Sequence, residues 1–335
     1  MKIALDAMGG DYAPSEPIKA AVLASKEYNC DIALVGFPDQ IQAELQKYGP
    51  QPRLSIVAAT DTIAMEEDKI VAAVRQHPEA SINVAMQMVK DGTADGMVSA
   101  GNSGAVMASA FFKLGRIRGI ERPAMGTLLP YNAGKLFLID IGANADCRPN
   151  HLVQFGEMAS VYMEKVIGVP RPRVGLLNQG EEDSKGNELI AETFERLKES
   201  KVNFIGNVEG QDIHKNVADI VVADGFTGNV ALKVGEGVAD YILQEIRGVI
   251  KSSPLFISAA LLLRPALRKA LKRLNYEEYG GANLLGVNGV VVIAHGRSKE
   301  NALKNALRVA NHSASRDLIA TMKEAFVAEP VASNT

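Results

Sequence analysis

The stretch ADGMVSAGNSGAV, residues 94–106, reads as an apolar strand, a glycine-rich turn and the first residues of a helix. A second stretch, ADIVVADGFTGNV at residues 218–230, aligns with the first without gaps and places Thr227 opposite Ser103. Apolar runs that do not alternate with polar residues are typical of strands buried on both faces of a mainly parallel sheet. Each stretch therefore predicts a strand, a G-x-[ST]-G turn and a helix.

Short runs rich in Val, Ile and Leu recur on both sides of these stretches, and turns and helical patterns follow them. The alternation of strands and helices over the whole length predicts an α/β fold, a three-layer α/β/α sandwich with a mainly parallel sheet. The predicted strands are residues 2–6, 32–35, 54–57, 96–99, 125–129, 136–140, 174–177, 220–223 and 290–294. The predicted helices include residues 17–28, 105–113, 153–166, 187–198 and 299–324.

The chain has 335 residues, of which 47% are hydrophobic, so it can bury a large core as one α/β domain or as two lobes. No low-complexity linker divides it, and we expect a single catalytic unit over residues 1–330 with a disordered tail at 331–335. Residues 247–275 break the α/β pattern, because they contain no strand pattern and no acidic residue. We interpret this basic segment as an amphipathic helical excursion from the core.

The composition excludes several classes of protein. A net charge of −3 gives no basic field that would attract nucleic acid. Two distant cysteines, Cys30 and Cys147, are typical of reduced cytosolic thiols. Asp6 comes too early for a signal peptide, and no apolar run approaches the ~20 residues that span a bilayer, so we expect a cytoplasmic protein. The absence of metal-ligand spacings and of the nucleotide motifs GxGxxG and GxxxxGK[ST] predicts no metal and no ATP or NAD cofactor.

The two matched turns suit an anion. Glycine lets the backbone come close to a ligand, the first helical N–H groups lack partners, and the helix dipole favours negative charge there. A third glycine-rich turn, MGGD at residues 8–11, follows the first predicted strand. The alternative is purely structural, because glycine, serine and threonine are also common at strand-to-helix junctions as turn and cap residues.

Five motifs together resemble one family. They are DAMGGDYAP at 6–14, VSAGNSGA at 98–105, DIGANADCRP at 140–149, NQGEEDSKGN at 178–187 and DGFTGNVALK at 224–233. In this order and spacing, the chain from residue 1 to about 326 resembles the phosphate acyltransferases of bacterial glycerolipid synthesis. Between them, residues 75–81 read RQHPEAS, which is less basic than the same region of that family. We therefore assign no phosphate or carrier contact to residues 75–81.

The resemblance implies an activity, partners and a fold. It implies transfer of a long-chain fatty acyl group from an acyl carrier protein to inorganic phosphate, without a cofactor. The product, an acyl phosphate, would be the donor for a membrane glycerol-3-phosphate acyltransferase. The resemblance also implies a homodimer and a fold similar to isocitrate and isopropylmalate dehydrogenases and to phosphotransacetylases.

Phosphate is itself a nucleophile, so this reaction requires no Ser or Cys nucleophile but does require donors for the phosphate and for the oxyanion. The first catalytic candidate is Lys185, in a polar loop after a predicted strand, and the second is Asn229, just inside the second matched turn. The resemblance implies that both act directly. The alternatives are a solvated lysine paired with neighbouring acids and a helix-capping asparagine. The candidates for contacts to phosphate or to the rest of the substrate are Gly9, Gly10, Asp11, Asn102, Ser103, Gly104, Asp224, Thr227 and Gly228.

Other reactive side chains are expected to be structural. The five histidines show no paired spacing, and a lone histidine is more often structural than a ligand or a base. Cys147 lies in a motif and could suggest an acyl-enzyme, but a buried small thiol explains it as well.

Within the excursion, leucines at 263, 267, 271 and 274 form one helical stripe, and Arg264, Arg268 and Lys272 form a neighbouring one. Such a helix suits an anionic membrane surface or an acidic carrier protein. A helix at an oligomer interface is the alternative, and the resemblance favours peripheral membrane contact.

Three other functions remain open from the sequence. A phosphotransacetylase-like enzyme would perform the same chemistry on acyl-CoA, although the basic, apolar excursion fits a carrier protein and lipid better. A decarboxylating dehydrogenase would need clustered carboxylates and arginines, and the sequence shows neither set. A catalytically inactive scaffold would not need Lys185 and Asn229 within intact motifs.

Overall fold

A computed structural model describes residues 1–129, 136–274 and 280–327 of the chain, with side chains omitted for 267–274 and 327. The predicted tail at 331–335 lies outside these residues. Within them, eleven strands form one sheet in the order β3-β2-β1-β4-β11-β10-β5-β6-β9-β7-β8. The strands are β1 (Lys2–Asp6), β2 (Asp31–Gly36), β3 (Leu54–Ala58), β4 (Gly96–Ser99), β5 (Ala124–Leu129), β6 (Leu136–Ile139), β7 (Arg173–Asn178), β8 (Asn203–Glu209), β9 (Ile220–Val222), β10 (Ala282–Leu285) and β11 (Val290–Ile293).

The sheet is mainly parallel, as predicted, but its direction reverses at the centre. The antiparallel pairs are β11–β10, β10–β5 and β5–β6, and every other pair of neighbouring strands is parallel. Consequently β1 to β4 and β11 run in one direction, whereas β6 to β9 run in the other. The carboxyl ends of β4 and β9, which carry the two matched turns, therefore lie at opposite edges of the sheet.

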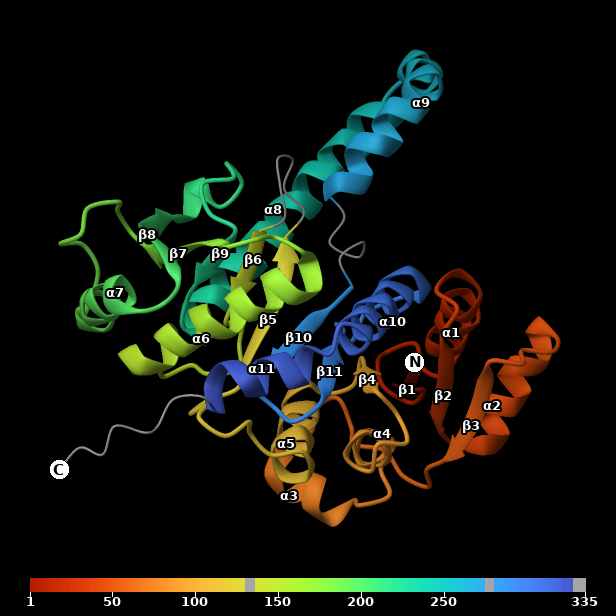
Figure 1. Ribbon diagram of the computed structural model, residues 1–335. Helices are drawn as coiled ribbons and strands as arrows, with labels where there is room; N and C mark the ends of the chain where they lie inside the picture. The colour runs from red at the N-terminus through yellow and green to blue at the C-terminus, as the bar shows by residue number, and fades with distance from the viewer. Residues whose placement is uncertain (130–135, 275–279, 328–335) are drawn as a thin grey trace.

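Helices cover both faces of the sheet, which confirms the three-layer α/β/α architecture (Figure 1). Successive side chains of β6 point to opposite faces of the sheet. Leu136 and Leu138 belong to one core cluster, whereas Phe137 and Ile139 belong to another. One face holds α3 (Ile70–Gln76), α4 (Ser81–Lys90), α5 (Ser103–Lys113) and the start of α8 (Gly225–Lys251). The other holds α1 (Ser15–Glu27), α2 (Pro38–Leu45), α6 (Pro149–Tyr162), α7 (Glu188–Glu199), α10 (Glu300–Ser315) and α11 (Leu318–Val327).

The predicted strands and helices all occur, with three differences. The strands β8 and β10 were not predicted, because β8 mixes polar residues and a glycine at the sheet edge and β10 is only four residues long. The single helix predicted for 299–324 is wrong, because Asp317 has a positive φ of 50° and separates α10 from α11.

The helices α8 and α9 (Pro254–Leu274) pack side by side and project away from the sheet as a hairpin (Figure 1). The predicted excursion, 247–275, covers the end of α8 and all of α9, but the projecting hairpin begins earlier, with α8 at Gly225. Within the described part of the chain, no helix is both long enough and apolar enough to cross a membrane.

Candidate active site

The first matched turn begins α5, and its asparagine is a helix cap. The side-chain oxygen of Asn102 accepts a hydrogen bond from the N–H of Ala105 at 3.1 Å, and its amide donates to the carbonyl of Met65 at 2.8 Å. Ser103 follows at the first helical position, and its exposed hydroxyl makes no hydrogen bond to the described residues. Asn102 therefore holds the turn in place, while Ser103 remains available to a ligand.

The second matched turn has the same division of roles. Asp224 caps α8 by accepting the N–H of Thr227 at 2.9 Å and its hydroxyl at 2.6 Å. Both side chains are thereby engaged in the cap, which accounts for them structurally. Asn229 lies two residues further on, is exposed, and has no side-chain partner among the described residues. In each turn the residue that can meet a ligand is the one beyond the cap.

The glycines of the second turn are needed for packing. A Cβ on Gly228 would lie 2.0 Å from the carbonyl oxygen of Asp140, and a Cβ on Gly225 would lie 2.7 Å from the N–H nitrogen of Asn144. Glycine at these positions lets the start of α8 lie directly on the backbone that follows β6. That packing explains both glycines without a ligand.

The two turns meet at one cavity, although the strands before them end at opposite edges of the sheet. The cavity has a volume of about 250 Å³ and lies between the starts of α5 and α8, over β5, β10 and β11. Ser103 and Asn229 both line it. Its other lining residues are mostly apolar, among them Met125, Leu128, Leu129, Ile141, Leu232, Ile293 and Ala302.

A third turn, after β11, contributes to the same cavity and was not predicted to be functional. His295 lines the cavity, and its Nδ1 accepts a hydrogen bond from the N–H of Arg297 at 3.2 Å. His295 is an exposed residue, and the partial burial of its ring, together with repulsion from Lys233 and Arg297, lowers its pKa below the ordinary value. A single histidine after a short strand gives little signal in a sequence, because nothing in its spacing marks a site.

Lys233 adds a charge to the cavity one helical turn after Asn229. It lines the cavity, and its Nζ pairs with the carboxylate of Glu236 at 2.8 Å. The pair places a cation close to the apolar wall while keeping that charge partly compensated.

The MGGD turn lies against the first matched turn but lines a different cavity, of about 190 Å³. A Cβ on Gly9 would lie 2.5 Å from the carboxylate of Asp6 and 2.7 Å from the N–H nitrogen of Gly101, so the two turns are in close contact. Asp11 is exposed and donates its N–H to the carbonyl of Gly296 at 2.9 Å. The residues that line this second cavity include Asp6, Gly9, Gly10, Thr62, Ser81 and Gly101.

Two buried aspartates anchor the loops behind these turns. Asp6 accepts the hydroxyl of Ser99 at 2.7 Å, and Asp140 accepts the N–H groups of Ala143 at 2.8 Å and Asn144 at 2.9 Å. Burial raises the pKa of both carboxyls above the ordinary value, while these hydrogen bonds oppose that shift. Their role is to fix loop geometry, since neither carboxylate lines the cavity of Ser103 and Asn229.

Cys147 is unsuited to nucleophilic catalysis. Its Sγ donates a hydrogen bond to the carbonyl of Asn144 at 3.5 Å, and burial together with the charge of Asp140 raises the pKa of Cys147 to about 12. A thiol with this pKa is almost entirely protonated at neutral pH, and the thiolate is the nucleophile. An acyl-enzyme at Cys147 is therefore disfavoured.

Lys185 lies outside both cavities in the described chain. It is exposed in the loop after β7, where Asn178 donates its amide to the Lys185 carbonyl at 3.0 Å. Among the described residues Lys185 forms no ion pair with a neighbouring acid, and Asp183 pairs instead with Lys198 at 3.4 Å. Since β7 and β9 are neighbouring parallel strands, the loop of Lys185 and the turn of Asn229 begin at the same edge of the sheet.

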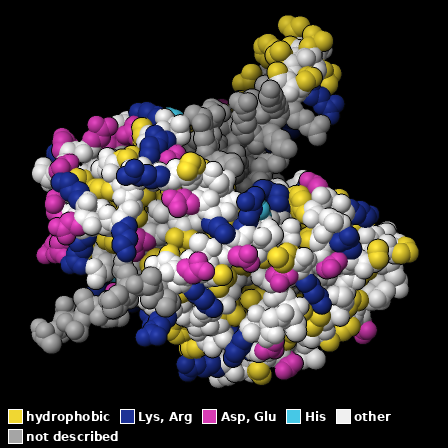
Figure 2. Space-filling model, in the orientation of Figure 1, with side chains coloured by type: hydrophobic (Ala, Val, Ile, Leu, Met, Phe, Trp, Pro, Cys, Tyr) yellow, Lys and Arg dark blue, Asp and Glu magenta, His cyan; other side chains and the backbone are white. Residues whose placement is uncertain are grey.

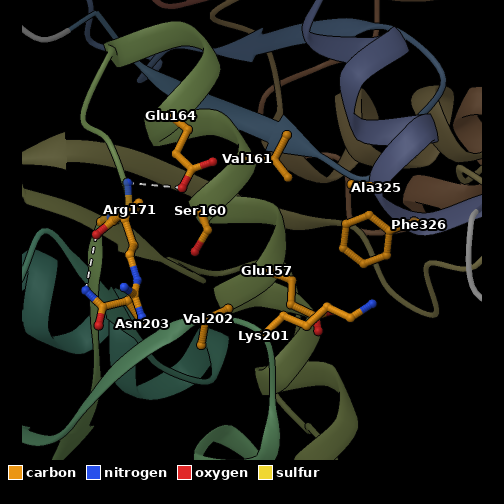
Figure 3. Close-up of a pocket in the computed structure, with 11 residues that line it drawn as sticks. Glu157, Ser160, Val161, Glu164, Arg171, Lys201, Val202, Asn203, Ala325 and Phe326 are labelled. Carbon is orange, nitrogen blue, oxygen red and sulfur yellow. Dashed lines mark hydrogen bonds between the residues drawn. The ribbon is translucent and has the colours of Figure 1, made fainter.

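A further cavity, of about 200 Å³, lies on the opposite face of the sheet, between α6, α11 and the residues before β7 and β8 (Figure 3). There Arg171 donates its N–H to Glu164 at 3.1 Å, and Asn203 donates to the Arg171 carbonyl at 3.2 Å. None of the predicted site residues lines this cavity.

The remaining candidates concern metals and the excursion. Within 1–129, 136–274 and 280–327, no three His, Cys, Asp or Glu side chains lie close enough together to hold a metal ion.

Arg264 is exposed on α9, whereas the side chains of Arg268 and Lys272 lie outside the described part of the structure.

Comparisons with known proteins place the chain in a family. A family model described as "Fatty acid synthesis protein" matches residues 1–321. The phosphate acyltransferase of Heliobacterium modesticaldum is 51% identical over 326 residues, covering 97% of each chain. That of Dictyoglomus turgidum is 50% identical over 313 residues, covering 92% of this chain and 93% of its own.

Solved structures confirm the predicted fold. The EutD phosphotransacetylase from Staphylococcus aureus matches with a TM-score of 0.62 at 14% identity and covers 94% of each chain. A 4-hydroxythreonine-4-phosphate dehydrogenase from Klebsiella pneumoniae matches with a TM-score of 0.56 at 13% identity, covering 94% of this chain and 99% of its own. At these identities the likeness concerns the fold alone.

Proposed function

Since this chain belongs to the phosphate acyltransferase family, we propose that it transfers a long-chain fatty acyl group from an acyl carrier protein to inorganic phosphate. The cavity between the starts of α5 and α8 is the observation that carries this proposal. It combines an apolar wall with polar donors from both matched turns. An acyl thioester and phosphate need that combination, because one substrate is largely aliphatic and the other is an anion.

The polar side of the cavity suits the phosphate. Ser103 provides a hydroxyl without a partner among the described residues and stands at the amino terminus of α5, where the first N–H groups have no helical partner. Asn229 provides an amide that is likewise unpaired in the described part of the chain, and Lys233 provides a cation. In this arrangement phosphate binds near the start of α5, and Asn229 lies across the cavity on the side of α8.

The apolar side of the cavity suits the acyl chain. Met125, Leu129, Ile141 and Leu232 form a continuous part of the core on the α5 and α8 face. An aliphatic chain against these residues is removed from water, which contributes about 0.8 kcal/mol for each methylene that is buried. This contribution favours long acyl chains over acetyl.

The reaction then needs no covalent enzyme intermediate. An oxygen of hydrogenphosphate attacks the carbonyl carbon of the thioester and forms a C–O bond, and the C–S bond then breaks. The proton of hydrogenphosphate ends on the sulfur, so the products are acyl phosphate and the free thiol of the carrier. Holding the two reactants together can lower the barrier by about 7–11 kcal/mol at most. We assign Asn229 and Lys185 to positioning the reactants and stabilising the charge of the transition state. The assignment of Lys185 rests on the resemblance of its motif to the family.

The hairpin of α8 and α9 supports a contact with a membrane surface. Figure 2 shows hydrophobic side chains gathered at its outer end, next to Lys and Arg side chains. Leu255 is 72% exposed and Leu262 is 85% exposed, and the exposed Arg264 follows Leu262 by two residues on α9. We propose that this end associates peripherally with an anionic membrane from the cytoplasmic side, where an acyl phosphate would pass to a membrane glycerol-3-phosphate acyltransferase.

The hairpin also supports a homodimer through a different set of residues. Val230, Val234, Val238 and Tyr241 are exposed and follow one another at intervals of three or four residues along α8. This spacing forms one apolar stripe on the helix. We propose that the stripe packs against a second copy of the chain.

A direct assay tests the proposed reaction. The purified protein is incubated with palmitoyl-carrier protein and phosphate, or with palmitoyl-CoA and phosphate, and acyl phosphate is detected by mass spectrometry. We expect the carrier thioester to give the higher kcat/KM. A preference for the CoA thioester would support the phosphotransacetylase-like alternative, and no acyl phosphate from either donor would refute the proposal.

A further inference from the structure

We propose that His295 is a catalytic residue of this enzyme, whose Nε2–H donates a hydrogen bond to the thioester carbonyl oxygen as that oxygen becomes negative. The inference rests on the function proposed above. No histidine stands out in the sequence, so the argument depends on where the fold places this ring and on which of its nitrogens is free.

The fold places His295 at the reacting end of the cavity. The residue follows β11, and its ring lines the same cavity as Ser103 and Asn229. The backbone around it is fixed at several points, since Ala294 donates its N–H to the carbonyl of Ser99 at 2.8 Å and Ser298 donates to the carbonyl of His295 at 2.8 Å. His295 therefore belongs to a tight turn between the first matched turn and the cavity.

The hydrogen bonds of the ring determine which nitrogen carries the proton. Nδ1 accepts the N–H of Arg297 at 3.2 Å, so Nδ1 of the neutral ring holds a lone pair and Nε2 holds the hydrogen. Nε2 has no hydrogen-bond partner among the described residues. The group available to a substrate is consequently an N–H donor, and the basic nitrogen is occupied.

Burial and the charges around His295 favour the neutral form of its ring. Burial and the nearby cations Lys233 and Arg297 lower its pKa, and the more weakly opposing acids are Glu236 and Asp11. A neutral imidazole donor does not transfer its proton to the thioester and does not bind phosphate as an ion. It stabilises a developing oxyanion in the way that other fixed N–H donors do.

In this role His295 acts on the oxyanion that forms when phosphate attacks the thioester. Phosphate oxygen attacks the carbonyl carbon, and the π electrons of the C=O bond move to the carbonyl oxygen. Nε2–H of His295 holds that oxyanion until the electrons return, the C–S bond breaks and the sulfur takes the proton from hydrogenphosphate. His295 ends the cycle in the protonation state in which it began.

Three substitutions distinguish a hydrogen-bond donor role of His295 from a role in packing alone. His295→Leu removes the N–H, His295→Gln places an amide N–H near the position of Nε2, and His295→Asn places one near Nδ1. We expect kcat to fall by about 10²–10³-fold in His295→Leu and His295→Asn, with the KM values within about threefold of the wild type. His295→Gln should stay within about tenfold of the wild-type kcat. His214→Leu is the control, because His214 is exposed and lies away from the cavity.

A binding measurement completes the test. The dissociation constant of a thioether analogue of the acyl-carrier substrate, with CH₂ in place of the carbonyl, should be the same for the wild type and His295→Leu. A normal kcat in His295→Leu, or an equal loss in His295→Gln and His295→Asn with raised KM values, would overturn the inference while leaving the proposed function intact. A wild-type protein that makes no acyl phosphate would overturn both.

Discussion

Replacing Gly228 with alanine tests whether the position of α8 controls the reaction. Gly228 lies in the first turn of α8, immediately before Asn229, and a Cβ there would lie 2.0 Å from the carbonyl oxygen of Asp140. Real Cβ contacts essentially never fall below 3.0 Å. The Asp140 loop cannot easily yield, because hydrogen bonds from Ala143 and Asn144 hold the buried carboxylate. Gly228→Ala therefore has to move the start of α8 by at least about 1 Å.

A movement of this size affects both stability and activity. Inserting a methyl group into a packed contact costs about 1–3 kcal/mol of the free energy of unfolding. A misplacement of about 1 Å at a reacting group costs about 10²-fold in rate, which corresponds to roughly 2.7 kcal/mol of activation free energy. We therefore expect folded Gly228→Ala protein with kcat reduced about 100-fold.

The same helix supplies a matched control. Gly235 lies two turns further along α8, and a Cβ there would meet no atom within 4 Å. Gly235→Ala should raise the free energy of unfolding by up to about 1 kcal/mol, because alanine has the higher helix propensity, and should leave kcat unchanged. Urea midpoints and acyl phosphate formation are measured for both variants and for the wild type. Wild-type kcat in Gly228→Ala would refute the link between the position of α8 and catalysis.

Four further predictions follow from the site and the hairpin. Lys185→Ala or Asn229→Ala should lower turnover by at least about 10²-fold with the fold intact, and near-normal turnover would remove that residue from the site. Activity should survive exhaustive EDTA treatment, and a loss that one divalent metal reverses would contradict the absence of a catalytic metal. Cys147 should alkylate much more slowly than an ordinary cysteine at pH 8, and faster as the pH rises towards about 12, whereas Cys147→Ala should keep its turnover. The variant Arg264→Glu/Arg268→Glu/Lys272→Glu should stop pelleting with anionic liposomes, since each cation contributes about 1 kcal/mol to membrane binding. Its turnover of a soluble acyl donor should remain unchanged. A variant that pellets normally but no longer dimerises would instead show that α9 is an interface helix.

Much of the fold could be predicted because its signals are local. The apolar runs at β1, β4, β7 and β11 are buried on both faces, so their composition alone marks them as strands. Strand direction is not local, and no residue of β5 or β10 indicates that the sheet reverses there. The sequence could therefore predict a mainly parallel sheet but not the opposite orientation of its two halves.

The candidate site was predictable only in part, for a related reason. The two matched turns pointed to Ser103 and, just inside the second turn, to Asn229, which line one cavity, but also to Thr227 and Asp224, which bond to each other. Residues that cap a helix and residues that bind a ligand are of the same polar types, and only the hydrogen-bond partners seen in the structure distinguish the two roles. His295 could not be found in this way, because its importance depends on the placement of β11 beside β4 and β10.

The reversal of the sheet explains how one cavity can use both matched turns. Met125 and Leu129 stand near the two ends of β5, and both line the cavity, so it follows the strand for roughly 13 Å at the usual rise per residue. Ser103 belongs to the turn after β4 and Asn229 to the turn after β9, at opposite edges of the sheet. In a wholly parallel sheet both turns would lie at one edge, and the donors would surround a compact ligand. Here they reach the cavity from opposite edges of the sheet, over an apolar floor, which suits a substrate that joins a long aliphatic chain to a polar reacting end.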